Sequence, residues 1–253
     1  MADEPLSIVV ICEARADQHA ACDIADRVLS QAVDWMQPEL LAHLRQWRGL
    51  KKSESFLAWK NVHTLAREAN IRINGHFEGQ PGAHDAFVAR RAMALLTTRG
   101  ERDIDAVLLL RDSDMDEDRR EGLEQARAQT SGLGPILIGV AHSKRECWVL
   151  AGFDAANTDE QSRLEALRRE LGFDPCLHAE ELTATSPGAK RDAKRVLSEL
   201  TQDDYQREVV CWTEAPLDQL EARGEKTGLA SFIQEVREQL VPLWTGRPAT
   251  QED

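Results

Sequence analysis

The sequence predicts an α/β fold in which helices cover both faces of a parallel central sheet. Three apolar runs carry this prediction, namely Leu6–Cys12, Ala106–Leu110 and Pro135–Ala141. Unbroken apolar runs of this length are typical of strands buried on both faces. A helical pattern follows each run, as in strand–helix units. We therefore expect strands near residues 6–12, 105–111 and 135–141 to lie parallel in one sheet.

The expected helices are defined by apolar residues at helical spacing. The first strand ends at Glu13, and a helix is expected from Asp17 to Val33. A helix over Glu117–Gln129 follows the second strand and should end at Gly132 and Gly134, a usual helix-stop signal. Helices are also expected at Glu146–Phe153 and Thr158–Leu171.

Residues 34–100 contain no convincing strand of core length. Helices are expected there at Pro38–Leu50, Ser53–Asn70 and His84–Thr98, with a loop at Ile71–Gly82. This pattern favours a helical insertion at 34–100 that shapes access to the sheet. Residues 186–247 show helical patterns only, which predicts a helical C-terminal extension. The whole of 1–253 is thus interpreted as one α/β domain.

Composition limits the classes of function. The chain has 253 residues, a net charge of −13 and 42% hydrophobic residues, as in a globular protein. Such a charge argues against adhesion of the whole surface to nucleic acid, although a local basic path remains open. The sequence shows no signal peptide and no membrane-spanning stretch, so we expect a cytoplasmic protein. The five cysteines lack CxxC spacing and are expected to be buried thiols.

An acidic cluster follows the second strand at Asp112, Asp114 and Asp116. Ligands of open α/β sheets bind at the carboxyl ends of strands, where these residues are expected. Carboxylate oxygens suit a hard divalent cation such as Mg²⁺ or Mn²⁺, which would relieve the repulsion between them. An ordinary acidic loop that caps the next helix is the alternative interpretation.

Other families share the Asp-x-Asp pattern. An EF-hand loop needs Gly at its sixth position and Glu at its twelfth, where this chain has Glu117 and Leu123. A haloacid-dehalogenase-like phosphatase usually has the motif on its first strand, whereas a complete strand–helix unit precedes it here. An Asp-x-Asp nucleotide-sugar transferase remains an alternative, but it does not explain Glu13.

A Glu after the first strand, combined with Asp-x-Asp after a later one, resembles the Toprim fold. The segment Lys144–Gly152 resembles a Glu-x-Trp-hydrophobic-Leu-Ala segment of small Toprim-like proteins, and the Ser186–Lys190 turn is similar to that group too. Those proteins are related to the nuclease half of the overcoming-lysogenization-defect (OLD) family. The likeness rests on short motifs between residues 6 and 200.

The resemblance implies a Mg²⁺-dependent nuclease that cleaves DNA or RNA, with Glu13 as general acid or base and the Asp pair as metal ligands. Glu13, Asp112 and Asp114 would hold the ions, and Asp116 or Glu146 would complete a second site. Lys190 or Lys144 would supply a cation to the developing charge. Arg15 and Arg111 would orient phosphate or neutralise the carboxylates.

The resemblance also implies a role in prokaryotic antiviral defence with an ATPase partner, since the chain has no Walker motif of its own. A homo-oligomer is left open. A non-catalytic module that binds a partner through its acidic end is the alternative from another class. Metal titration distinguishes the two, because only the nuclease should bind Mg²⁺ or Mn²⁺ and cut nucleic acid.

Overall fold

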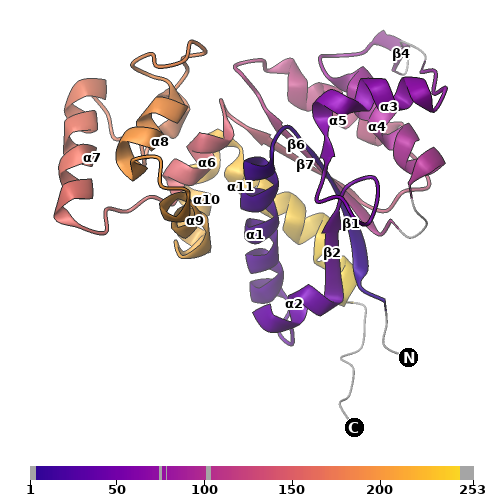
Figure 1. Cartoon of the computed structure of the whole chain (residues 1–253), viewed down its shortest axis with the longest axis horizontal. Helices are drawn as coiled ribbons and strands as arrows, with labels where there is room; N and C mark the ends of the chain where they lie inside the picture. Colours follow the sequence, from indigo (N-terminus) through magenta and orange to yellow (C-terminus); the bar gives the residue numbers. More distant parts are fainter. Residues whose placement is uncertain (1–3, 74–75, 78, 101–103, 246–253) are drawn as a thin grey trace. The chain divides into compact units, whose positions relative to one another are not determined.

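The computed structural model describes residues 4–73, 76–77, 79–100 and 104–245 and contains a five-stranded parallel sheet (Figure 1). The strand order is β2-β1-β6-β7, and β3 also pairs with β1. The strands are β1 (Leu6–Cys12), β2 (Arg45–Arg48), β3 (Leu57–Ala58), β6 (Ala106–Asp112) and β7 (Ile136–Ala141). The predicted α/β class is confirmed, and the three apolar runs are neighbours in one sheet.

The central strands are apolar because both of their faces are covered. Every residue of β1 and β7 is buried, and so is every residue of β6 except its last, Asp112. Strands β1 and β6 pair in register from Ile8 with Ala106 to Ile11 with Leu109. They therefore end at the same edge of the sheet, and Glu13 follows β1 there.

Residues 34–100 contain no long strand, but the helices expected at Pro38–Leu50 and Ser53–Asn70 are interrupted by two short strands of the sheet, β2 and β3. Strand β2 pairs parallel with β1, and β3 pairs with the end of β1. Strand β2 was read as helix because it is short and polar. Its Arg48 is fully buried and donates to Ser7 Oγ and to the carbonyls of Gly49 and Leu50, so the buried charge is solvated by the protein itself.

The chain divides into two compact units, which are described separately. Unit 1 comprises Met1–Arg111, Glu117–Gly139 and Gln234–Asp253, and unit 2 comprises Asp112–Asp116 and Val140–Ile233. In unit 1, α1 packs on β1 and on the π-helix Val236–Leu240, and α4 packs on α3 and α5. Its helices are α1 (Arg15–Ala32), α2 (Pro38–Leu44), α3 (Val62–Glu68), α4 (Ala86–Arg99), α5 (Asp118–Ala128) and α12 (Pro242–Thr245); a 3-10 turn spans Trp59–Asn61, and β4 (His76–Phe77) pairs with β5 (Gln80–Pro81).

Unit 2 is mostly helical, as the sequence predicts for Glu146–Phe153, Thr158–Leu171 and the residues from 186 onward. Its α7 has the predicted bounds and begins where Asn157 accepts the N–H groups of Asp159 and Glu160. It ends at Gly172, whose φ of 86° is a left-handed conformation that favours glycine. The helices are α6 (Arg145–Ala151), α7 (Thr158–Leu171), α8 (Ala193–Thr201), α9 (Tyr205–Thr213), α10 (Leu217–Gly224) and α11 (Leu229–Glu235), with 3-10 turns at Ala179–Glu181 and Glu225–Thr227. Residues 246 and 247 of the predicted extension lie outside the described residues.

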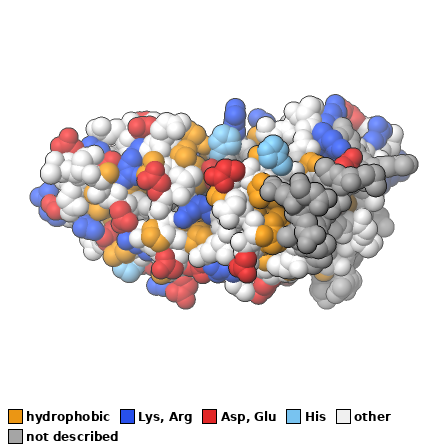
Figure 2. Space-filling model, turned by 90° about the horizontal axis from the view of Figure 1, so that it is seen from below, with side chains coloured by type: hydrophobic (Ala, Val, Ile, Leu, Met, Phe, Trp, Pro, Cys, Tyr) orange, Lys and Arg blue, Asp and Glu red, His pale blue; other side chains and the backbone are white. Residues whose placement is uncertain are grey.

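All five cysteines are buried and form no disulfide, which confirms the prediction of buried thiols. Burial raises the pKa of Cys147 and Cys211 to about 12, so both stay protonated at neutral pH. None of the helices in the described part of the chain has the length and hydropathy needed to span a bilayer. On the face drawn in Figure 2, acidic and basic side chains are interspersed with hydrophobic ones.

Candidate functional site

The acidic turn of unit 2, residues Asp112–Asp116, is fastened to the segment that follows β7. Asp112 Oδ1 accepts the backbone N–H of Arg145 at 2.8 Å. The backbone N–H of Asp114 donates to the carbonyl of Ser143 at 2.9 Å. Asp114 and Met115 have φ values of 45° and 67°, a left-handed conformation that Asp tolerates better than most residues. These bonds join the Asp-x-Asp motif to the Lys144–Gly152 motif.

Lys144 is a buried cation of this site. Its Nζ lies 2.8 Å from Asp192 Oδ1, and the two side chains are only 11% and 4% exposed. Burial alone would lower the pKa of Lys144, but Asp192 raises it above the usual range, aided by the charges of Glu146 and Asp114. Burial likewise opposes the ionisation of Asp192, yet Lys144 and the N–H of Gly188 hold its pKa below the usual range. Both groups are therefore charged at neutral pH.

Glu146 lies in the first turn of α6, where the sequence left open a metal ligand or a helix-stabilising charge. Its side chain is 10% exposed, and Arg145 Nη2 lies 3.2 Å from Oε1. Arg145 also lies 3.3 Å from Glu208 Oε2, and burial raises the pKa of Glu208 although Arg145 opposes this. Glu146 Oε2 is buried and accepts no hydrogen bond from the described residues. This oxygen therefore lacks the hydrogen bond that buried polar atoms usually have.

Glu13 belongs to unit 1, where it meets two arginines. Its exposed carboxylate pairs with Arg111 Nη1, and Arg119 Nη1 lies 4.0 Å away. Arg111 also donates to the buried Asp85 at 2.9 Å and stacks 4.7 Å above the ring of Trp59. Of the two roles expected for Arg111, the structure places it where it neutralises carboxylates.

The predicted site residues are thus distributed over both units. Asp112, Asp114, Asp116, Glu146 and Lys190 belong to unit 2, and Glu13 belongs to unit 1. The convergence of Glu13 with the Asp pair stays a prediction.

The remaining candidates lie in loops or on the surface. Asp116 lies in the turn before α5, with its N–H donating to Ser113 O at 2.8 Å. Lys190 is exposed in the loop before α8, and its carbonyl accepts from Arg195. Arg15 Nε donates to His19 at 3.1 Å.

Sequence reasoning missed Asp85, Arg119 and Asp192. Asp85 is buried against Arg111 and lies 3.8 Å from Arg119. Asp192 lies 48 positions from its partner Lys144. A local pattern carries no signal for pairs so distant in the chain, although an Asp before a helix does indicate a cap, and Asp192 caps α8.

A divalent cation is the cofactor that the sequence predicts. Among the described residues, no group of three or more His, Cys, Asp or Glu side chains is placed to hold a metal ion. Mg²⁺, however, is usually bound by one or two carboxylates together with water and substrate phosphates. The acidic turn supplies carboxylate oxygens of that kind, and Glu146 Oε2, in the Lys144–Gly152 motif, is a buried acceptor without a hydrogen bond from the described residues. The donor types fit a hard cation.

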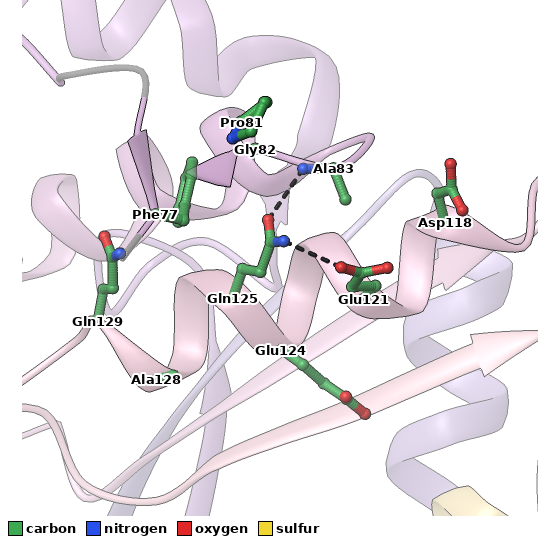
Figure 3. Close-up of a pocket in the computed structure, with 10 residues that line it drawn as sticks. All are labelled: Phe77, Pro81, Gly82, Ala83, Asp118, Glu121, Glu124, Gln125, Ala128 and Gln129. Carbon is green, nitrogen blue, oxygen red and sulfur yellow. Dashed lines mark hydrogen bonds between the residues drawn. The ribbon is translucent and has the colours of Figure 1, made fainter. Parts of the chain in front are cut away.

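One hollow of unit 1 lies between α5 and the β4–β5 hairpin (Figure 3). Its volume is about 700 Å³, and Phe77 and Pro81 form its apolar side. Gln125 accepts the N–H of Ala83 at 2.9 Å and donates to Glu121 at 3.2 Å, so α5 holds the hairpin. Asp118, Glu121 and Glu124 give the α5 wall a negative charge, which disfavours an anionic ligand.

No family model matches the chain, and no curated protein or solved structure matches it either.

Proposed function

We propose that the chain is a metal-dependent nuclease that hydrolyses phosphodiester bonds of DNA or RNA at the acidic turn of unit 2. The observation that carries the proposal is that the Asp112–Asp114 motif and the Lys144–Gly152 motif contact each other within unit 2. Asp112 binds the backbone of Arg145, and the charge of Asp114 acts on Lys144. Carboxylates and a buried cation at the end of a parallel strand suit phosphoryl chemistry.

Asp112 and Asp114 would hold the Mg²⁺ or Mn²⁺ ion, with Glu146 and Asp116 as the residues that would complete a second site. When bound, the ion supplies charge neutralisation on the phosphoryl group. The buried Oε2 of Glu146 supports this assignment, because a buried carboxylate oxygen without a hydrogen bond is costly unless a cation compensates it.

Lys144 would bind a non-bridging phosphoryl oxygen through its ammonium group. Asp192 orients that group, and the raised pKa keeps it protonated throughout the physiological range. Lys190 is exposed in the loop before α8 and would bind the nucleic acid at a position away from the phosphate that reacts. Glu13, which pairs with Arg111 and lies 4.0 Å from Arg119, would act as general acid or base.

The reaction consumes one water molecule. Its oxygen bonds to phosphorus while the ester P–O bond breaks, and one of its protons passes to the leaving oxygen. Glu13 would take or deliver that proton.

The same proposal has three further parts. These are membership of the Toprim-like group, a role in antiviral defence and an ATPase partner. Their support is the resemblance of the Glu13, Asp112–Asp114 and Lys144–Gly152 motifs. Copurification of the chain with its genomic neighbours, followed by an ATPase assay, tests the partner.

Cleavage of plasmid DNA and tRNA with Mg²⁺ or Mn²⁺ tests the hydrolysis. We expect wild-type protein to cut at least one substrate and Asp112→Asn or Asp114→Asn to lose the activity by 100-fold or more, at about 3 kcal/mol of transition-state stabilisation. Asp159→Asn removes the same charge from an exposed position of α7 and should retain full activity. Wild-type protein that cuts neither substrate and binds no metal would leave the partner-binding module as the better description.

A further inference from the structure

Five basic residues line two hollows on unit 1, and we call them the basic face. They are His63, Arg67, Arg72, Arg90 and Arg91. One hollow has a volume of about 280 Å³ and is lined by His63, Arg67, Asn70, Ile71, Arg72 and Arg91. The other has a volume of about 370 Å³, and its lining includes Arg72, Arg90, Thr97, Thr98, Thr130 and Ser131. Arg72 lines both, so the two hollows adjoin.

The charge of three arginines of the basic face, Arg67, Arg72 and Arg91, is not compensated by a carboxylate within the described part of the chain. No acidic side chain is among the described residues that line either hollow. Arg67, Arg72 and Arg91 form no ion pair with any described carboxylate. By contrast, Arg45 pairs with Asp26 and Arg127 with Glu235. Like charges gathered in this way repel one another until an anion binds between them.

The arginines carry the donors that a ligand would meet. The hydroxyls of Thr97, Thr98 and Thr130 already donate to helix carbonyls at 3.0, 2.7 and 2.7 Å. Arg90 stacks over Phe77 at 5.3 Å, which orients its guanidinium. Arg67 and Arg72 are exposed, and Arg91 is half-buried on α4, which packs against α3. Guanidinium groups bind phosphate in a bidentate geometry that suits exposed sites of this kind.

We propose that the basic face binds the sugar–phosphate backbone of a nucleic acid. This inference rests on the proposed function, for which it supplies the surface that holds the substrate. A net charge of −13 would repel a polyanion from most of the surface, so binding requires a local patch of positive charge. Several arginines over two adjoining hollows match a repeated anion better than a single small one.

The test measures binding of labelled 20-nucleotide DNA and RNA by fluorescence anisotropy. EDTA is present throughout and prevents metal-dependent cleavage. Affinity is measured between 50 and 200 mM KCl, because each phosphate contact adds about 0.7 to 0.9 to the negative slope of log K against log salt. The triple variant R67Q/R72Q/R91Q should lose about 2 to 3 units of slope and at least 10-fold in affinity. The variant R67K/R72K/R91K should keep most of the slope, because lysine at these positions keeps the positive charge.

The matched control is R168Q/R169Q/R191Q, which removes the same charge from exposed positions of unit 2. It should change the slope by less than half a unit. If the basic-face variant loses binding while wild-type protein never cleaves, the inference stands and the proposed hydrolysis fails. If the glutamine triple variant binds and cleaves like wild type, or if the face binds an acidic peptide and no nucleic acid, the inference is overturned.

Discussion

Replacement of Asp192 by Ala should destabilise unit 2 strongly, because Asp192 organises the surroundings of Lys144. Its Oδ1 lies 2.8 Å from Lys144 Nζ, and its Oδ2 accepts the N–H of Gly188 at 2.9 Å. Oδ1 also lies 3.3 Å from the N–H of Lys194, at the start of α8. The substitution removes all three contacts and leaves a buried ammonium without its main partner.

Loss of one partner of a buried ion pair costs about 3–5 kcal/mol, and loss of a helix cap costs about 1 kcal/mol. Asp114 and Glu146 also raise the pKa of Lys144, so part of its charge stays compensated. We therefore expect Asp192→Ala to lower the free energy of unfolding by about 3 kcal/mol. The double variant Lys144→Met/Asp192→Leu should recover most of this loss, because no buried charge is left.

Urea unfolding followed by tryptophan fluorescence and circular dichroism measures the effect, with both probes compared because the two units need not unfold together. Asp159→Ala and Lys190→Met are the exposed controls. Since the folded pKa of Asp192 is lowered, its contribution is present above the unfolded pKa near 4 and is lost as the pH falls through the folded value. A cost below about 1 kcal/mol at pH 7, the range of exposed ion pairs, would refute the reasoning.

Three more predictions concern buried groups. Glu160→Gln should destabilise the protein more at pH 7 than at pH 3, because Arg207 holds the pKa of Glu160 below its usual range and this contribution is lost as the pH falls; equal losses in urea titrations at both pH values would contradict it. The thiol of Cys147, with a pKa of about 12, should react with a disulfide reagent only as fast as the protein opens, and rapid labelling of native protein would argue otherwise. Asp85→Ala should cost about 3 kcal/mol in thermal or urea unfolding because Arg111 stays buried, and a cost under about 1 kcal/mol would be inconsistent with that.

The elements predicted best are those whose burial leaves a local trace in the sequence. Strands β1, β6 and β7 are buried on both faces, so each is a continuous apolar run. Helix α7 has the bounds that its amphipathic pattern predicts, and in the structure Asn157 caps its start and Gly172 ends it. Neither requires knowledge of a distant partner.

Strand β2 was missed for the opposite reason. Its residues Arg45–Arg48 are mostly polar, and their place in the sheet depends on partners elsewhere in the chain. Arg45 and Trp47 both donate to Asp26 of α1, and Arg48 donates to Ser7 of β1. An apolar pattern cannot reveal a strand that is held by such bonds.

The candidate site shows the same division. The Asp112–Asp114 motif could be located because it interrupts an apolar run. The partner of Lys144 could not, since Asp192 is far along the chain, and Glu13 could not be recognised as the neighbour of Arg111. Motifs in the sequence thus indicated Lys144 and Arg111, whereas their partners Asp192 and Asp85 had to come from the structure.

The central claim is a metal site at Asp112 and Asp114. Measuring Mn²⁺ binding by electron paramagnetic resonance tests it most directly, because the measurement needs no substrate. The wild-type chain should bind Mn²⁺ with loss of the free-ion signal, and D112N/D114N should weaken binding at least 10-fold, at about 1.4 kcal/mol per factor of ten. Asp159→Asn should bind as wild type does. Equal Mn²⁺ affinity of D112N/D114N and wild-type protein, or no binding by either, would contradict a metal site at Asp112 and Asp114.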